Sequence, residues 1–359
     1  MDGPRRTLVV LYGGRSAEHD VSRVSASLMI RAADPGRYDI VGVGITRDGR
    51  WLRNPSLCFA GAGPRDVPDE LTVEGDPVDP QDLLRSDTVF VPVLHGPMGE
   101  DGTVQGLLET MDVPYVGSGV LASAVAMDKA IAKQLIGAAG IPQVRHVVLH
   151  TDEISAGALE SAVSSLGDEV FVKPANMGSS VGVSRARGAA DALAACRVAA
   201  RYDSWVLVEE AVNGREIEVA VLGNRGARAS LPGEITPAAE FYDYEDKYVD
   251  GAAELTVPAR LTAEQTQQVR DLALRAYAAL RCEGMARVDF FLEENGRGFL
   301  CNEVNTIPGF TPISMYPRMW EATGLSHRAL VDGRFTKVEG TDREIEADLV
   351  FLAMGFVGP

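Results

Sequence analysis

The stretch that decides the fold is "EVFVKPANMGSSVG", residues 169–182. Its apolar run Val170-Phe-Val172 predicts a buried strand that ends on Lys173. The following loop, Gly178–Gly182, is small and flexible, and it exposes backbone N–H groups that favour an anion such as phosphate. A lysine beside such a loop adds a point charge for that phosphate. Taken alone, the stretch is more simply explained by a solvent-exposed loop beside a lysine that only covers apolar surface.

A second informative region is the predicted hairpin of residues 284–305, with Asn295-Gly296 as its turn. Side chains two positions apart in a strand share a face, so Arg287 lies beside Asp289, and Glu303 beside Asn305. A two-residue turn would set Asp289 opposite residue 302, whereas one bulged residue would set it opposite Glu303.

Either register of the hairpin brings two carboxylates and an amide oxygen together. Such hard oxygen ligands suit Mg²⁺ that bridges to nucleotide phosphates. The alternative is a solvated outer face on which Arg287 simply pairs with Asp289. The runs Phe290-Phe-Leu292 and Phe299-Leu-Cys301 favour a sheet that is buried on at least one side, and buried carboxylates need a partner such as a cation.

Composition narrows the class of protein. The 359 residues suffice for two or three domains, and a net charge of -17 argues against nucleic acid or an anionic membrane as the main partner. No apolar run is long enough for a bilayer span, and no signal-like apolar core follows the N-terminus. The four cysteines form no CxxC pair, so we expect a reduced, cytoplasmic protein without structural zinc.

Patterning along the chain predicts an α/β protein. Strands at 7–12, 38–46 and 88–94, a helix ending near residue 33 and an irregular stretch at 54–80 indicate a parallel sheet in the first 120 residues. Beyond it we expect one helix over 121–139, further helices at about 188–201 and 262–281, and strands at 144–149, 169–173, 205–209 and 215–222. No period is apparent in 238–252.

Four further residues are weaker candidates when each is taken alone. Lys129 would most simply be an exposed helix lysine. Glu209 and Glu210 close a strand, where one of them could accept hydrogen bonds from a base or sugar, or both could be solvated. A lone histidine is more often structural than catalytic, but His95 follows a strand of an open α/β sheet, where ligands bind.

Taken together, these motifs resemble the D-alanine–D-alanine ligases of the ATP-grasp superfamily. The matching pieces occur in the family's order over about residues 5 to 325. They are Gly13-Gly14 with Ser16-Ala-Glu18, Leu94-His-Gly96 with Gly99–Gly102, Met127-Asp-Lys129, Lys173-Pro174 with Gly178–Gly182, Glu209 with Glu216, Tyr244 with Lys247-Tyr248, Arg287 with Asp289, and Glu303 with Asn305 and Pro308-Gly309.

The resemblance implies an ATP-grasp fold. An N-terminal Rossmann-like parallel-sheet domain (1–122) would precede a small central α+β domain (123–213) and a C-terminal α+β domain with the metal site (214–326). It also implies a reaction that serves peptidoglycan synthesis: ATP activates one D-alanine as an acyl phosphate, and the amine of a second D-alanine attacks it.

The resemblance also implies a role for each matched residue. Lys129, Lys173 and Ser180 would bind ATP phosphates, Lys247 the γ-phosphate, Glu209 the adenine and Glu216 the ribose. Asp289, Glu303 and Asn305 would hold two Mg²⁺ ions, with Mn²⁺ as an alternative. Arg287 and the Gly309 N–H would stabilise the oxyanion. Glu18, Ser179 and Tyr248 would act together on the first D-alanine, with His95 near its carboxylate and Ser314 at the second.

Two features bear on how far the resemblance extends. Tyr248 goes with peptide rather than ester formation in this family, which is commonly homodimeric. The tail, 327–359, instead resembles a segment of the small subunit of glutamate synthase. We interpret it as the remnant of a gene fusion or recombination that carries no activity. Two alternatives stay open: an ATP-grasp ligase that makes an ester or a mixed dipeptide, and a nucleotide-binding protein that its tail has disabled.

Overall fold

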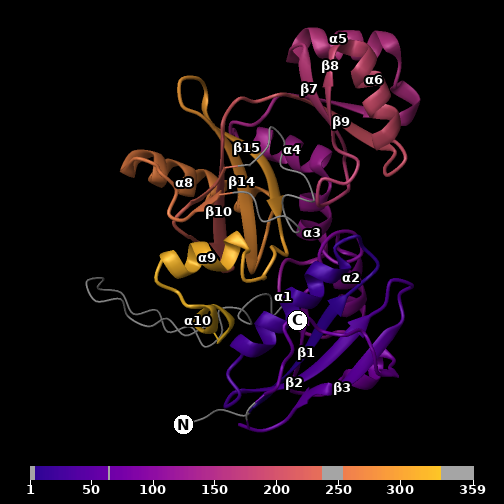
Figure 1. Ribbon diagram of the computed structural model, residues 1–359, viewed down its shortest axis with the longest axis vertical. Coiled ribbons are helices and arrows are strands. Elements are labelled where there is room, and N and C mark those ends of the chain that lie inside the picture. Colours follow the sequence, from indigo (N-terminus) through magenta and orange to yellow (C-terminus); the bar gives the residue numbers. More distant parts are fainter. Residues whose placement is uncertain (1–4, 64, 237–253, 333–359) are drawn as a thin grey trace.

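A computed structural model describes residues 5–63, 65–236 and 254–332, whose strands form three sheets (Figure 1). Lys247, Tyr248 and the patternless stretch 238–252 lie outside the described residues, as does the tail from residue 333. Within the described ranges, no helix has the length and apolar character needed to cross a bilayer. The fold is mixed α/β, as the sequence predicts, and the boundaries proposed between its domains stay predictions.

The N-terminal sheet has the strand order β4-β3-β2-β1-β5. Strands β1 (Arg6–Gly13), β2 (Tyr38–Ile45) and β5 (Thr88–Pro92) are parallel, as predicted. The expectation of an irregular stretch over 54–80 is partly wrong, because β3 (Trp51–Phe59) and β4 (Asp76–Pro77) add an antiparallel edge. Helices α1 (His19–Ala32) and α2 (Thr103–Thr110) and a 3₁₀ turn (Pro80–Leu83) complete this region.

The single helix predicted over 121–139 is two helices, α3 (Val120–Met127) and α4 (Lys129–Ala138). The break is at Asp128, whose backbone is extended and whose side chain accepts hydrogen bonds from the N–H groups of Ala130 and Ile131. An aspartate in this geometry is a favourable N-cap, and it starts a new helix here. The break places Lys129 at the first position of α4.

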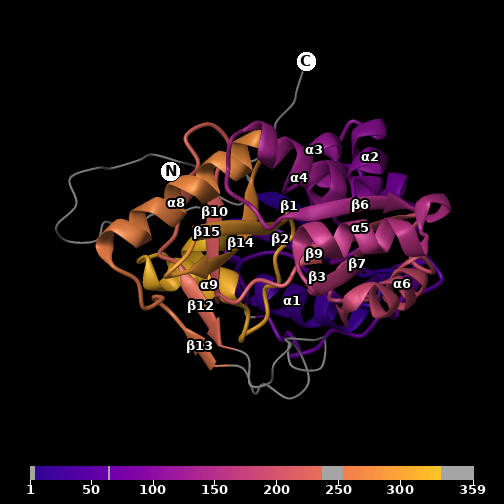
Figure 2. The same ribbon diagram turned by 90° about the horizontal axis from the view of Figure 1, so that it is seen from above.

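The central sheet is antiparallel, in the order β6-β9-β7-β8. Its strands are β6 (His146–His150), β7 (Glu169–Pro174), β8 (Ser184–Arg187) and β9 (Trp205–Glu210). Helix α6 (Gly188–Ala199) was predicted, whereas α5 (Ala156–Leu166) was not; a 3₁₀ turn (Thr151–Glu153) precedes α5. Both helices pack on the sheet and give this region a core of its own (Figure 2).

The C-terminal sheet follows the order β13-β12-β10-β14-β15, with β11 paired to β10. The strands are β10 (Arg215–Leu222), β11 (Arg228–Ala229), β12 (Gly233–Thr236), β13 (Glu254–Thr256), β14 (Met285–Glu293) and β15 (Gly298–Asn305). Helix α8 (Ala263–Ala279) packs on the face that carries Ile217, whereas α9 (Met315–Ala322) packs on the face that carries Ala220.

The β14–β15 hairpin settles the register that the sequence left open. Near the turn, Glu293 pairs with Gly298, so the loop has four residues rather than the two of an Asn-Gly turn. A register shift then follows Asp289, which lies opposite Glu303. The bulged arrangement is therefore the one that forms.

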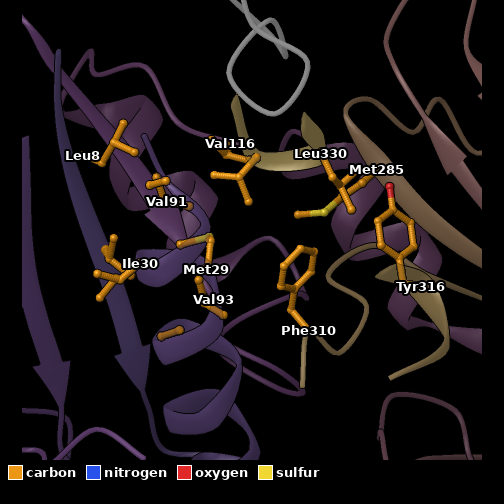
Figure 3. Packing of buried hydrophobic residues seen from close by; sticks show 14 of the residues in the cluster. Leu8, Met29, Ile30, Val91, Val93, Val116, Met285, Phe310, Tyr316 and Leu330 are labelled. Atoms are coloured by element: carbon orange, nitrogen blue, oxygen red, sulfur yellow. The ribbon is translucent and has the colours of Figure 1, made fainter. Parts of the chain in front are cut away.

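The N-terminal and C-terminal sheets share one apolar core. Leu8 and Met29 of the first region pack in the same cluster as Phe310, Tyr316 and Leu330 of the last (Figure 3). Helix α10 (His327–Asp332) adds polar contacts, since Asp332 Oδ1 accepts from the Asp34 N–H (2.8 Å). These two sheets therefore belong to one packed unit, whereas the central sheet has a hydrophobic core of its own.

Candidate active site

A cleft of about 850 Å³ lies where the three sheets meet. Every predicted site residue within the described ranges lines it: Glu18, His95, Lys129, Lys173, Ser179, Ser180, Glu209, Glu216, Arg287, Asp289, Glu303, Asn305, Gly309 and Ser314. These residues come from distant parts of the chain, so folding gathers them into one site.

Two lysines face the carboxylates of the hairpin across the cleft. The Lys173 ammonium lies 2.6 Å from Glu209 Oε2 and donates to Asn302 Oδ1 (3.3 Å). The Lys129 ammonium donates to the carbonyl of Met177 (2.6 Å) and lies 3.7 Å from Glu303 Oε2. Burial disfavours a charged lysine, but the Glu209 and Glu303 carboxylates outweigh burial and raise the pKa of Lys173. Lys173 therefore keeps its positive charge in the wall of the cleft.

The Gly-Ser-Ser loop closes directly onto Glu18. A Cβ atom at Gly178 would lie 2.8 Å from Glu18 Oε2, and one at Gly96 would lie 2.6 Å from it, so a side chain at either position would displace the Glu18 carboxylate. Ser179 and Ser180 adopt left-handed backbone angles (φ 49° and 59°), which are uncommon for residues other than glycine. This strained turn brings the phosphate-binding type of loop against the N-terminal wall of the cleft.

The hairpin contributes a patch of carboxylates around one arginine. Arg287 Nε and Nη2 donate to the two oxygens of Asp289 (2.8 Å each), and Nε lies 3.2 Å from Glu218 Oε1. Glu218 on β10 and Glu303 on β15 lie opposite Asp289 on its two sides. Although burial alone would lower it, the pKa of Arg287 is raised by Asp289 and Glu218, so this side chain remains a cation.

This patch has the donor chemistry for a hard divalent cation. Asp289 and Glu303 face each other across the hairpin, and Asn305 donates its amide to Asp289 Oδ2 (3.0 Å). Among the residues described, no three carboxylate, imidazole or thiolate side chains converge on a single point. Two carboxylates, one amide oxygen and the oxygens of a bound phosphate make up the set that Mg²⁺ commonly takes. The residues therefore fit the ion that the sequence predicts.

The N-terminal wall is joined to the 306–310 loop by buried hydrogen bonds. His95 Nδ1 donates to the carbonyl of Ile307 (2.9 Å), and its Nε2 accepts from the hydroxyl of Ser25 (3.0 Å). Ser25 also accepts from the N–H of Phe310 (3.1 Å). Burial lowers the pKa of His95, which suits this neutral tautomer. His95 thus holds the loop that carries Gly309.

Gly309 and Ser314 lie against each other at the far end of the cleft. A Cβ atom at Gly309 would lie 2.9 Å from Ser314 Oγ. That hydroxyl already accepts from the N–H of Thr311 (2.9 Å) and lies 2.8 Å from its hydroxyl. The absence of a side chain at Gly309 keeps its backbone accessible beside the serine.

Sequence reasoning missed three buried ionisable residues at or directly behind the site. Lys133 and Glu218 are buried, and each follows a predicted residue on the same face, one turn after Lys129 and two positions after Glu216. Helix and strand periodicity could have found them. Glu100, buried against Gly96 and Ile307, lies in a matched motif, but only the fold brings it to the cleft.

Three sheets around one charged cleft, with a lysine from a strand and a lysine from the start of a helix facing a carboxylate hairpin, define the class of ATP-grasp enzymes. Comparison with known proteins identifies the family. The chain matches the models "D-ala D-ala ligase N-terminus" over residues 7–118 and "D-ala D-ala ligase C-terminus" over residues 135–334. The protein therefore belongs to the D-alanine–D-alanine ligase family.

Individual relatives agree with this assignment. The chain is 44% identical to the D-alanine--D-alanine ligase of Streptococcus thermophilus, over 91% of this chain and 94% of that protein. It is 45% identical to the enzyme of the same name from Caldicellulosiruptor bescii, over 90% and 93%.

Solved structures give the same result. The D-alanine-D-alanine ligase from Coxiella burnetii has a TM-score of 0.76 and 33% identity, with 91% of this chain and 92% of that chain covered. The VanG D-Ala:D-Ser ligase from Enterococcus faecalis has a TM-score of 0.77 and 32% identity, with 90% and 97% covered.

Proposed function

We propose that this protein joins two D-alanine molecules to D-alanyl-D-alanine, a peptidoglycan precursor, with conversion of ATP to ADP and phosphate. Membership of the ligase family supports this function. The observation that carries the proposal is one cleft lined by the Gly-Ser-Ser loop, by Glu18, which lies directly against that loop, and by the hairpin arginine. One site can thus hold a phosphate donor and a small amino acid together.

The nucleotide would occupy the side of the cleft between the central and C-terminal sheets. Lys129 and Lys173 supply positive charge for its α- and β-phosphates, and Ser180 in the loop donates to a phosphate. Glu209 accepts from the adenine amino group, and Glu216 accepts from the ribose. Lys247, outside the described residues, would reach the γ-phosphate.

Asp289, Glu303 and Asn305 would hold Mg²⁺, for which Mn²⁺ is an alternative. When bound, the ion neutralises charge on the β- and γ-phosphates. Arg287 lies beside these residues and remains charged, so it can stabilise negative charge that develops at the reacting carbonyl.

The first D-alanine would bind near Glu18, which accepts from its ammonium group and, in the proposal, is hydrogen-bonded with Ser179 and Tyr248. His95 orders the loop near its carboxylate. That carboxylate attacks the γ-phosphorus, ADP leaves, and an acyl phosphate forms. This step replaces a poor leaving group, hydroxide, with phosphate.

The second D-alanine would bind with its carboxylate at Ser314. Its amine attacks the acyl carbon, and Arg287 and the N–H of Gly309 stabilise the tetrahedral oxyanion. The carbon–oxygen bond to phosphate then breaks, the amine loses its proton, and the dipeptide is released. We also propose a cytoplasmic homodimer, as is common in the family.

The test measures phosphate release from Mg²⁺-ATP with D-alanine, L-alanine, or D-alanine together with D-serine or D-lactate, with products identified by mass. We expect the D-alanyl dipeptide with D-alanine alone and no product with L-alanine. A preferred D-serine or D-lactate product would replace the proposed acceptor. Absence of every product, in protein that still binds ATP, would overturn the proposed ligation.

A further inference from the structure

Lysine is rare in this chain and is concentrated at the cleft. The sequence has five lysines among its 34 lysine and arginine residues. Of the three in the described ranges, Lys129 and Lys173 line the cleft, whereas Lys133 lies behind its wall. Elsewhere in these ranges the basic side chain is arginine, so the three lysines mark a place where a compact point charge is used.

Lys133 is a buried cation on the hidden side of Glu209. It is 1% exposed, and its ammonium lies 3.0 Å from Glu209 Oε1. The other oxygen, Oε2, lies 2.6 Å from the ammonium of Lys173. Burial would raise the pKa of Glu209, but the two ammonium groups outweigh burial and lower it. One carboxylate is therefore held ionised between two lysines, of which only Lys173 reaches the cleft.

Lys133 determines the net charge of the group formed by Glu209, Lys173 and Lys133. A buried Glu209–Lys173 pair would be neutral, and Lys173 would present little net charge to a phosphate. With Lys133 offsetting the carboxylate, the trio carries one net positive charge. Lys133 also lies 3.0 Å from Oε1 without lining the cleft, whereas Glu209 itself faces the cleft.

We infer that Lys133 is a positioning residue that sets the choice of purine, an inference that rests on the proposed binding of ATP beside Glu209. A carboxylate can only accept hydrogen bonds, so it favours a purine with an amino group at carbon 6 over one with a carbonyl oxygen there. By keeping Glu209 ionised and oriented, Lys133 enforces that preference without touching the nucleotide.

The experiment measures equilibrium binding of ATP and of ITP, its 6-oxo counterpart, to the full-length protein with Mg²⁺ and without D-alanine. The variants are Lys133→Met, Glu209→Gln and the double variant, with Arg297→Met as a matched control that breaks another ion pair in the same interface. Thermal unfolding of each variant reports its stability.

We expect wild type and the control to prefer ATP strongly. In Lys133→Met, the affinity for ATP should fall about 10- to 100-fold, the loss of one charge-assisted hydrogen bond, and the ATP-to-ITP preference should shrink to about threefold. In the Glu209→Gln background, adding Lys133→Met should change ATP affinity by less than about threefold, because Lys133 acts through Glu209.

A folded Lys133→Met protein that keeps the wild-type preference would show a purely structural ion pair and overturn the inference. If Lys133→Met does not fold, the double variant, which removes both members of the Lys133–Glu209 pair, is compared with Glu209→Gln. A difference of more than about tenfold in their ATP-to-ITP ratios would also overturn it. Failure of the wild type to bind ATP would instead contradict the proposed function itself.

Discussion

Two ionic clusters join the central sheet to the β14–β15 hairpin, and they differ in composition. The cleft cluster consists of Lys129, Lys133, Lys173, Glu209 and Glu303. The hairpin cluster consists of Arg145, Glu210, Glu293 and Arg297. Glu209 and Glu210 are neighbours on β9, so their side chains point to opposite faces and enter different clusters.

The hairpin cluster is closed. Glu210 Oε1 accepts from Arg297 (2.6 Å), its Oε2 accepts from Arg145 Nε (2.7 Å), and the two arginines are matched in charge by Glu210 and Glu293. The cleft cluster holds three ammonium groups against two carboxylates, which leaves one positive charge beside a cavity. A bound anion can therefore balance the charge of the cleft cluster, whereas the hairpin cluster is already neutral. This difference in net charge distinguishes a binding site from a purely structural contact.

The largest expected effect is loss of a cleft charge. Lys173→Met should lower kcat/KM for ATP about 10²- to 10³-fold, because it removes a cation aimed at the phosphates. Stability should change little, since Lys133 still pairs with Glu209. Steady-state kinetics and thermal unfolding measure both, and Arg297→Met is the control, with kcat/KM expected within about threefold of wild type. Equal losses of kcat/KM in Lys173→Met and Arg297→Met would contradict the conclusion that only the cleft cluster binds the substrate.

A second substitution in the cleft cluster, at Glu303, should weaken the binding of Mg²⁺. Glu303→Gln keeps the shape of the side chain but removes a hard, charged ligand opposite Asp289. The Mg²⁺ concentration that gives half-maximal rate should rise about tenfold or more. Titration of activity with Mg²⁺ at saturating ATP measures it, and an unchanged Mg²⁺ dependence would remove Glu303 from the ion-binding set.

The sequence was informative about this comparison only in part. Strand alternation and family motifs identified the hairpin, the Gly-Ser loop and both predicted lysines of the cleft. Strand alternation could not separate Glu209 from Glu210, because two adjacent acids at a strand end are chemically alike until the fold supplies lysines to one and arginines to the other. Only the family motifs singled out Glu209. The role of Lys133 likewise depends on what its helix covers.

The errors in the fold have local physical causes. The apolar period continues across Asp128, so the cap that splits α3 from α4 is hidden by a pattern that fits one long helix. Strand β3 was missed because its burial does not alternate regularly and it contains Pro55, a residue tolerated at sheet edges. At Asp128 a short capping signal decides the structure against a longer apolar pattern, whereas β3 forms in spite of a breaking residue.

The hairpin cluster should respond in stability rather than in catalysis. Glu210→Ala removes the buried centre of the cluster and leaves two arginines without it, at a cost of about 3 kcal/mol, which corresponds to a fall in Tm of roughly 5–10 °C. The value of kcat/KM below the transition should stay within about threefold of wild type. Thermal unfolding followed by assays at low temperature measures both.

The loss of stability in Glu210→Ala should become smaller as the pH falls. Burial would raise the pKa of Glu210, but hydrogen bonds from Arg297 and Arg145 lower it. Stabilisation by a carboxylate with a lowered pKa is present at neutral pH and is lost as the pH falls through the folded-state pKa, which lies below the ordinary glutamate pKa of 4.5. The stability gap between wild type and Glu210→Ala should therefore narrow on acidification, and a gap independent of pH would mean that charge is not its source.

Glu100 offers the smallest and most selective test, because it is a buried carboxylate in neither cluster. Its oxygens accept from the backbone N–H groups of Gly96 (2.9 Å) and Ile307 (3.3 Å) rather than from a cation. Burial and then the nearby Glu18 carboxylate raise the pKa of Glu100 to about 8. The folded protein thus retains a proton at neutral pH that the unfolded chain has lost.

That proton predicts a trend opposite to the one for Glu210. Stabilisation from a raised carboxyl pKa is present at low pH and is lost as the pH rises through about 8. Between pH 7 and 9 the free energy of unfolding of wild type should fall by about 1 kcal/mol more than that of Glu100→Gln, which cannot titrate. Denaturant unfolding at each pH measures the difference, with the exposed Glu160→Gln as control.

Parallel pH profiles for wild type and Glu100→Gln would mean that Glu100 is already ionised at pH 7. Its two N–H donors would then outweigh burial, and it would belong with the charged carboxylates of the cleft.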